Sequence, residues 1–113
     1  MSLPPGRQIK FKFGFDAAWE TAVCIYNGAS KLVERGNYSR SRSAWQFKNT
    51  THETVSLDVT SWHKQSGPNS GKPWMQSRYK KTLWKHPLYA IGFEDDGGSS
   101  PDFNDATVNM LMI

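Results

Sequence analysis

The chain has 113 residues and a mass of 12.8 kDa, a size typical of one domain, and we expect residues 1–113 to form a single domain. Aromatic residues make up 13% of the chain, which argues against intrinsic disorder, and the single cysteine excludes an internal disulfide and a cysteine-rich zinc site. The formal charge of +4 is unevenly placed. Residues 1–93 carry all 14 Lys and Arg residues, whereas residues 94–113 carry five of the ten acids and no base.

The two ends of the chain carry different signals. No basic segment followed by an apolar one marks a secretory signal, and no apolar run approaches the roughly 20 residues of a membrane helix. We therefore expect a soluble protein without a transmembrane segment, of unknown compartment, either cytoplasmic or exported without a Sec-type signal. The apolar residues 108–113 predict a final strand that packs in the core or against a partner.

Period-two alternation from Ile9 to Phe15 predicts a half-buried strand. The turn residues 27–30 begin with Asn-Gly and predict a hairpin, because both residues accept positive φ at low cost. Further candidate strands lie at 22–26, 31–34, 44–48, 54–62, 75–84, 88–93 and 106–112, with a polar loop at 65–73. Within 54–62, Val55, Leu57 and Val59 share one face. This pattern indicates an all-β sandwich or a small barrel.

Residues 94–105 hold five carboxylates, those of Glu94, Asp95, Asp96, Asp102 and Asp105. Like charges at this spacing repel one another, and a bound cation removes that cost. Calcium takes six to eight oxygen ligands from carboxylates, amides and carbonyls, and the segment has no His or Cys that would favour zinc or copper. A solvated acidic turn is the alternative. The spacing Asp102-x-Asn104-Asp105, running directly into a strand, favours the metal, although it does not fit an EF-hand.

Two motifs carry a resemblance to a known family. Residues 93–97 (Phe-Glu-Asp-Asp-Gly) and 102–106 (Asp-Phe-Asn-Asp-Ala) resemble the calcium-binding loop of the small bacterial calcium-dependent fucose/mannose-binding lectins, typified by the second lectin of Pseudomonas. The opening Leu-Pro segment and the first strand, which ends before Asp16, are similar to the start of that family. The resemblance implies an antiparallel β-sandwich of about nine strands, a homodimer or higher homo-oligomer, and bound calcium that coordinates a monosaccharide or glycan directly.

The resemblance also implies site residues. Asp102, Asn104 and Asp105 match shared calcium ligands, Glu94 matches the leading Glu with Asp96 as its rival, and Asp16 falls where a backbone carbonyl contributes. The implied sugar-binding residues are Asp16, Ala17, Ala18, Trp19, Asp96, Asp102, Asn104 and Asp105. The chain departs from the family by a longer stretch from Glu94 to Asp102 and by an earlier end at Ile113. One or two calcium ions, the completion of the site by a partner subunit, and the sugar itself therefore stay open.

Other features are weighed against this interpretation. Trp62, Trp74 and Trp84 lie among basic residues and could stack on nucleic-acid bases or on sugar rings, but we expect them to fill the core. We expect Cys24 to be a buried small hydrophobe. Asn37 and Asn49 begin glycosylation sequons, to which we give no weight. No nucleophile or acid–base pair is legible, so we expect a non-enzyme. The alternatives are a calcium-stabilised interaction module and, less favoured, a basic nucleic-acid-binding domain.

Overall fold

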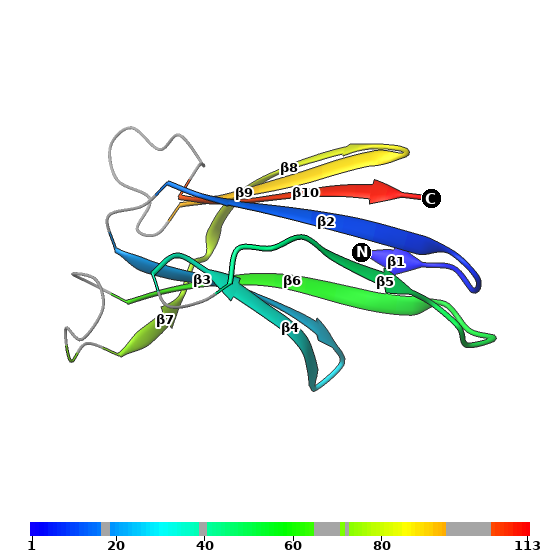
Figure 1. Cartoon of the computed structure of the whole chain (residues 1–113), viewed down its shortest axis with the longest axis horizontal. Helices are drawn as coiled ribbons and strands as arrows, with labels where there is room; N and C mark the ends of the chain where they lie inside the picture. Colours follow the sequence, from blue (N-terminus) through cyan, green and yellow to red (C-terminus); the bar gives the residue numbers. More distant parts are fainter. Residues whose placement is uncertain (17–18, 39–40, 65–70, 72, 95–104) are drawn as a thin grey trace.

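The computed structural model describes residues 1–16, 19–38, 41–64, 71, 73–94 and 105–113. Within these residues, ten strands form two antiparallel sheets (Figure 1). The strands are β1 (Ser2–Leu3), β2 (Gln8–Phe15), β3 (Glu20–Asn27), β4 (Ser30–Gly36), β5 (Trp45–Lys48), β6 (Val55–Lys64), β7 (Trp74–Gln76), β8 (Tyr79–Lys85), β9 (Leu88–Glu94) and β10 (Ala106–Met112). In this part of the chain there is no helix long and apolar enough to cross a membrane.

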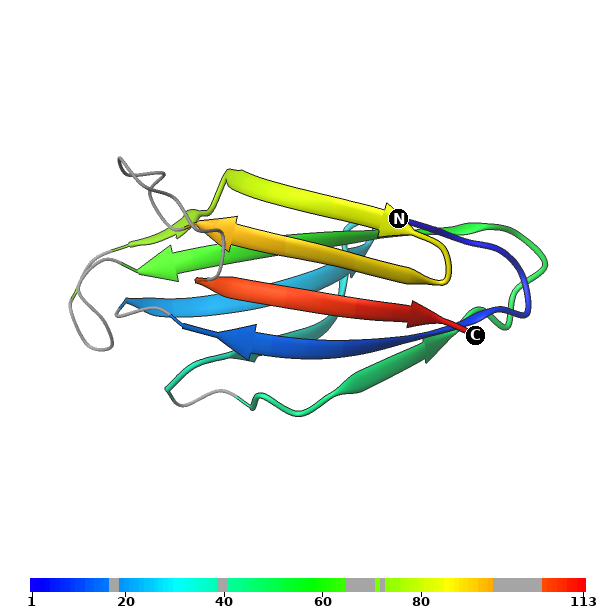
Figure 2. The same ribbon diagram turned by 90° about the horizontal axis from the view of Figure 1, so that it is seen from above.

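The first sheet has the order β1-β6-β3-β4, with β7 also paired to β6. The second sheet has the order β5-β2-β10-β9-β8. Figures 1 and 2 show the two sheets as stacked layers whose strands run roughly along the long axis of the molecule. This arrangement confirms the predicted antiparallel β-sandwich.

The core lies between the two sheets. Residues that alternate along each strand point into it: Ile9 and Phe11 in β2 and Val108 in β10 are 0% exposed, and Met110 is 2% exposed. The buried core residues are Leu3, Ile9, Phe11, Val23, Ile25, Val33, Leu57, Val59, Ile91, Phe93, Ala106, Val108 and Met110. Burial of one such Val, Leu, Ile, Phe or Met side chain contributes about 1.5–3 kcal/mol, so the period-two pattern is what fixes the strand faces.

Two local predictions are confirmed. Asn27 pairs with Ser30 across a tight turn between β3 and β4, and Gly28 takes the positive φ of 62° that the Asn-Gly signal indicates. In β6, Leu57 and Val59 face the core, with exposed fractions of 0% and 6%. Local turn chemistry and alternation were therefore sufficient for these elements.

The predicted strand over residues 75–84 is two strands in different sheets. β7 pairs with β6 in the first sheet, whereas β8 pairs with β9 in the second. Between them, Ser77 is 4% exposed, and its backbone N–H donates a hydrogen bond to the carbonyl oxygen of Ser61 at 2.7 Å. The chain changes layers at Ser77 without a Gly or Pro there, so composition gave no sign of the break.

The final strand, β10, lies in the second sheet between β2 and β9 (Figure 2). One face of it packs in the core through Val108 and Met110. The other face points outward, and Leu111 there is 39% exposed. The apolar end of the chain thus contributes to the core on one side and leaves apolar surface on the other.

The expectation that three tryptophans fill the core is wrong. Trp62 and Trp74 are only partly buried and line a hollow on the outer face of the first sheet, and Trp84 is 50% exposed. Phe, Ile, Leu, Val and Met side chains fill the core in their place. Cys24, in contrast, is buried as predicted, with 5% of its surface exposed.

Candidate acidic metal-binding edge

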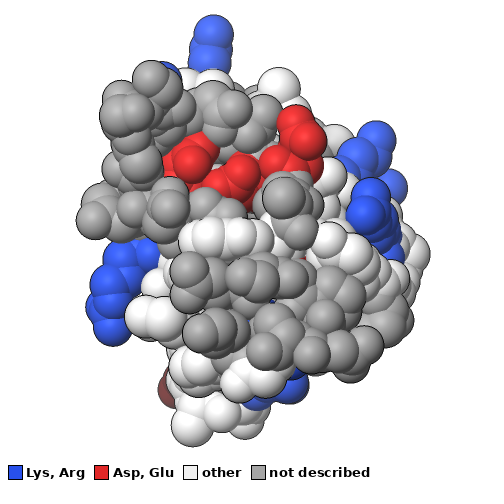
Figure 3. Space-filling model, turned by 90° about the vertical axis from the view of Figure 1, so that its left-hand side faces the viewer, with Lys and Arg blue, Asp and Glu red and all other residues white. Residues whose placement is uncertain are grey.

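Four carboxylates of the described residues lie where strands begin or end at one edge of the sandwich. Asp16 directly follows β2, Glu20 begins β3, Glu94 ends β9, and Asp105 directly precedes β10. Figure 3 looks onto the molecule from the left-hand side of Figure 1 and shows Asp and Glu side chains gathered in one area, with Lys and Arg toward the rim. The fold therefore gathers these acids at one end of the sandwich, with basic residues around them.

Strand pairing brings three of these acids to neighbouring positions. Phe93 pairs with Ala106, and Ala106 pairs with Phe15, so the next residues along (Glu94, Asp105 and Asp16) lie at the ends of three adjacent strands. The backbone N–H of Asp16 donates a hydrogen bond to the carbonyl oxygen of Asp105 at 3.1 Å. Since adjacent strands are about 4.8 Å apart, these strand ends form one acidic edge.

The acids of this edge differ in exposure. Glu94 is 7% exposed and Glu20 is 5% exposed, and each makes interactions within the protein. A buried carboxylate is costly unless hydrogen bonds, an ion pair or a metal compensate its charge. Glu20 was not predicted as a site residue. It begins β3 only four residues after Asp16, so the short connection between β2 and β3 brings it to this end.

The donors at this edge are oxygens, which suit a hard cation such as calcium. In the part of the chain that the structure describes, no group of three or more His, Cys, Asp or Glu residues could by itself hold a metal ion. The predicted ligands Asp96, Asp102 and Asn104 lie outside the described residues. They belong to residues 95–104, which join Glu94 to Asp105 and are therefore tied to the edge at both ends. The strand ends thus present oxygen donors of the kind that calcium binds.

Residues 16–19, which the resemblance assigns to sugar binding, lie between β2 and β3 in the chain. Ala17 and Ala18 are outside the described residues, whereas Asp16 and Trp19 are within them. The indole of Trp19 stacks on the ring of His63, with 5.8 Å between the ring centroids. Asp16 at the start of this segment is therefore held at the second sheet, and Trp19 at its end is held at the first sheet.

Asn37 anchors the far end of that segment. Its Nδ2 donates to the carbonyl oxygen of Trp19 at 2.9 Å, and its Oδ1 accepts from the backbone N–H of Thr21 at 2.8 Å. The hydroxyl of Thr21 donates to the same Trp19 carbonyl at 3.2 Å. Asn37 is 4% exposed, so these hydrogen bonds are shielded from water. Sequence reasoning set Asn37 aside as the start of a sequon, and no local pattern signals its contact with Trp19.

No protein-family profile matches the chain, and no curated protein matches it. Several solved structures match it in fold. A Chromobacterium violaceum lectin in complex with α-methyl-fucoside matches with a TM-score of 0.66 at 16% identity, covering 96% of this chain and 90% of that one. The C-terminal domain of a Burkholderia cenocepacia lectin matches with a TM-score of 0.61 at 19% identity, covering 96% and 89%.

A high-affinity mannose-binding lectin from Ralstonia solanacearum matches with a TM-score of 0.64 at 14% identity, covering 96% of this chain and 90% of the lectin. At these low identities, the matches establish the fold and not the roles of individual residues. Over nearly its whole length, the chain has the fold of the bacterial calcium-dependent fucose/mannose-binding lectins that its acidic loop resembles.

Proposed function

We propose that this protein is a lectin that binds a monosaccharide through calcium held at the acidic edge. The observation that carries the proposal is the alignment of Glu94, Asp105 and Asp16 at the ends of three adjacent strands. The fold supports the proposal, because solved lectins share this fold over 96% of the chain.

In this proposal Glu94 and Asp105 hold the ion from the two strand ends, and Asp102 and Asn104 contribute from the segment between them. Asp96 is the alternative to Glu94, and Asp16 contributes its backbone carbonyl. Bound calcium, one ion or two, supplies coordination positions that sugar hydroxyls fill in place of water. The protein contributes the carboxylates, whose mutual repulsion a bound cation relieves.

The sugar would lie between this site and the segment of residues 16–19. Ala17 and Ala18 offer small apolar side chains, and Trp19 offers an aromatic one. Fucose and mannose are the first candidates, because one fold neighbour is bound to α-methyl-fucoside and another is a mannose-binding lectin. In this proposal the protein acts by binding and not by catalysis, which agrees with its three fold neighbours being lectins.

Calcium binding is tested by isothermal titration calorimetry of the calcium-free protein. We expect saturable binding by the wild type and loss of affinity by at least about tenfold in Asp105→Asn, because a neutral amide replaces one carboxylate ligand. Glu53→Gln is the matched control, since it removes one exposed carboxylate away from the acidic edge. Absence of calcium binding by the wild type, or equal loss in both variants, contradicts the proposed site.

A further inference from the structure

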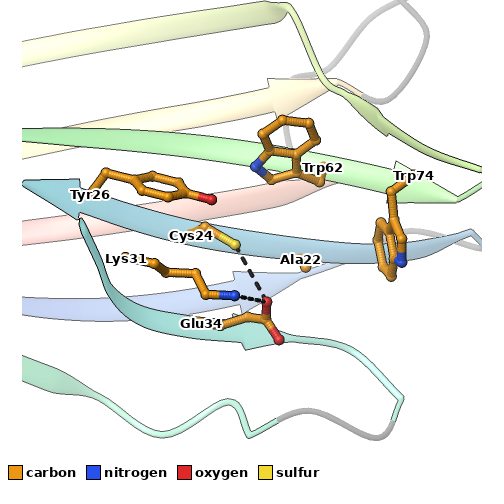
Figure 4. A pocket seen from close by; sticks show the side chains of 7 residues that line it. All are labelled: Ala22, Cys24, Tyr26, Lys31, Glu34, Trp62 and Trp74. Carbon is orange, nitrogen blue, oxygen red and sulfur yellow. Dashed lines mark hydrogen bonds and ion pairs between the residues drawn. The ribbon is translucent and has the colours of Figure 1, made fainter. Parts of the chain in front are cut away.

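A hollow of about 230 Å³ lies on the outer face of the first sheet (Figure 4). Strand register explains it. Ala22 in β3 lies between Gly36 in β4 and Trp62 in β6, so the smallest side chains of this face stand next to one of the largest. Together with Cys24, Ala22 forms the floor, and the two residues are 3% and 5% exposed although they point away from the core. Taller side chains around them account for this burial.

Aromatic side chains form the walls. Figure 4 shows Trp62 and Trp74 on one side of the floor and Tyr26 opposite, with its hydroxyl turned toward the hollow. The Trp62 indole is held in place: its Nε1–H donates to the hydroxyl of Thr60 at 2.9 Å, and that hydroxyl donates to the carbonyl oxygen of Cys24 at 2.9 Å. A fixed indole loses little entropy when a ligand stacks on it.

A charged pair closes the hollow on the β4 side. Lys31 Nζ lies 3.1 Å from Oε1 of Glu34, and the thiol of Cys24 donates to the same oxygen at 3.6 Å. The pair brings hydrogen-bond donors and acceptors to the rim, and its two charges cancel. An apolar ligand would cover this pair without replacing its water contacts, and a cation or an anion would meet one repelling partner.

A neutral pyranose ring meets these conditions. Its C–H face is apolar and flat enough to pack on an indole, and its hydroxyls both donate and accept hydrogen bonds at the ring edge. We propose that this hollow is a second saccharide-binding subsite, independent of calcium, in which a neutral pyranose stacks on Trp62 with its hydroxyls toward Glu34 and Lys31. The subsite does not rest on the proposed calcium function, because its lining residues belong to β3, β4, β6 and β7 and not to the acidic edge.

The test uses the full chain in excess EDTA, with methyl β-D-glucopyranoside as the probe and the tryptophan indole N–H signals in ¹H–¹⁵N NMR spectra as the readout. We expect saturable shifts of the Trp62 signal with a Kd in the range of about 1–10 mM, which corresponds to a weak single-ring contact. Trp62→Ala should abolish the shifts that the glycoside causes in the other indole signals, such as that of Trp74. Glu34→Gln should weaken binding several-fold and serves as the second variant if Trp62→Ala does not fold.

Trp84→Ala is the matched control, because Trp84 is 50% exposed and belongs to β8 in the other sheet. It should leave binding unchanged. Three results overturn the proposal: no saturable shift in the wild type, equal loss in Trp84→Ala, or a shift of the Trp62 signal by adenosine monophosphate with none by the glycoside. Because calcium is absent throughout, failure here leaves the proposed calcium site unaffected.

Discussion

Buried asparagine side chains fix two of the chain's connections. Asn49 is 0% exposed, and its Nδ2 donates to the carbonyl oxygens of Leu3 at 2.9 Å and Glu53 at 2.7 Å. Its Oδ1 accepts from the backbone N–H of Thr51 at 3.0 Å and from the Thr51 hydroxyl. Asn37 and Asn49 each begin a glycosylation sequon, yet the side-chain amide nitrogen of each donates a hydrogen bond to a backbone carbonyl oxygen within the protein. The folded chain therefore presents neither side chain for glycosylation.

Asn49→Ala is predicted to lower the free energy of unfolding by about 2–4 kcal/mol, because it removes these hydrogen bonds and leaves buried carbonyl groups unpaired. Gln76→Ala is the matched control, since Gln76 is exposed on β7 in the first sheet and its loss should change stability by less than about 0.5 kcal/mol. Urea denaturation followed by tryptophan fluorescence measures both. Similar losses in the two variants would show that the Asn49 network does not stabilise the fold.

At the scale of the elements, Gly14 in the β2–β10 pair leaves no room for a side chain. Gly14 pairs with Thr107, and a Cβ on Gly14 would lie 2.7 Å from Thr107 Oγ1, closer than real Cβ atoms come to other heavy atoms. This contact lies two residues before Asp16, at the start of the acidic edge. Glycine here lets the two central strands of the second sheet approach normally.

Gly14→Ala is therefore predicted to cost about 1–3 kcal/mol of stability, the range for an overpacked site. Thr107→Ala removes the clashing hydroxyl, so the double variant should recover most of that loss. Thermal unfolding of the four proteins in a double-mutant cycle measures the coupling. Additive losses would mean that the Thr107 hydroxyl is not what the new methyl group meets.

Sequence patterns predicted elements where the information is local. Alternation identified β2 and one face of β6, and Asn27-Gly28 identified the hairpin, because period and turn chemistry depend on adjacent residues. The change of layers at Ser77 was not predicted, since the residues on both sides look like strand. The tryptophans were misplaced for a related reason. Alternation tells which residues share a face, but it does not tell which face is covered.

At the scale of the whole molecule, the outer face of the second sheet carries an apolar patch over β8, β9 and β10, near the turn between β8 and β9. Leu88 pairs with Leu111 and Leu83 pairs with Ala90, and the three leucines are 59%, 39% and 64% exposed. Lysines 10, 12 and 85 flank them around a hollow of about 580 Å³. Exposed apolar patches on this scale mark interaction surfaces. We propose that this face forms the predicted homodimer, with the lysines extending to the rim of the interface.

Leu88→Lys is predicted to convert the dimer to a monomer, because it buries an uncompensated charge beside the flanking lysines. The wild type should sediment with about twice the chain mass of 12.8 kDa in analytical ultracentrifugation. Met75→Lys is the matched control, since Met75 is 58% exposed on β7 in the other sheet. A monomeric wild type, or dissociation by both substitutions, contradicts this interface.

The candidate site shows the same division between local and distant information. The acidic segment 94–105 is visible as a run of carboxylates, and the resemblance named its ligands. The resemblance also named Asp16, but its position beside Asp105 comes from the pairing of β2 with β10, whose residues are separated by most of the chain. Asn37 was missed because its hydrogen bonds to Trp19 and Thr21 join segments that are far apart in sequence.

The central claim, that calcium mediates sugar binding, is tested most directly by titrating methyl α-L-fucopyranoside and methyl α-D-mannopyranoside into the calcium-loaded and the chelator-treated protein. We predict a saturable heat of binding with at least one glycoside when calcium is present, and loss of that heat after chelation. Asp102→Ala should also lose the calcium-dependent heat. A rise in melting temperature with calcium but no response to either glycoside would favour a calcium-stabilised interaction module. Equal heats with and without calcium would contradict the proposed mechanism.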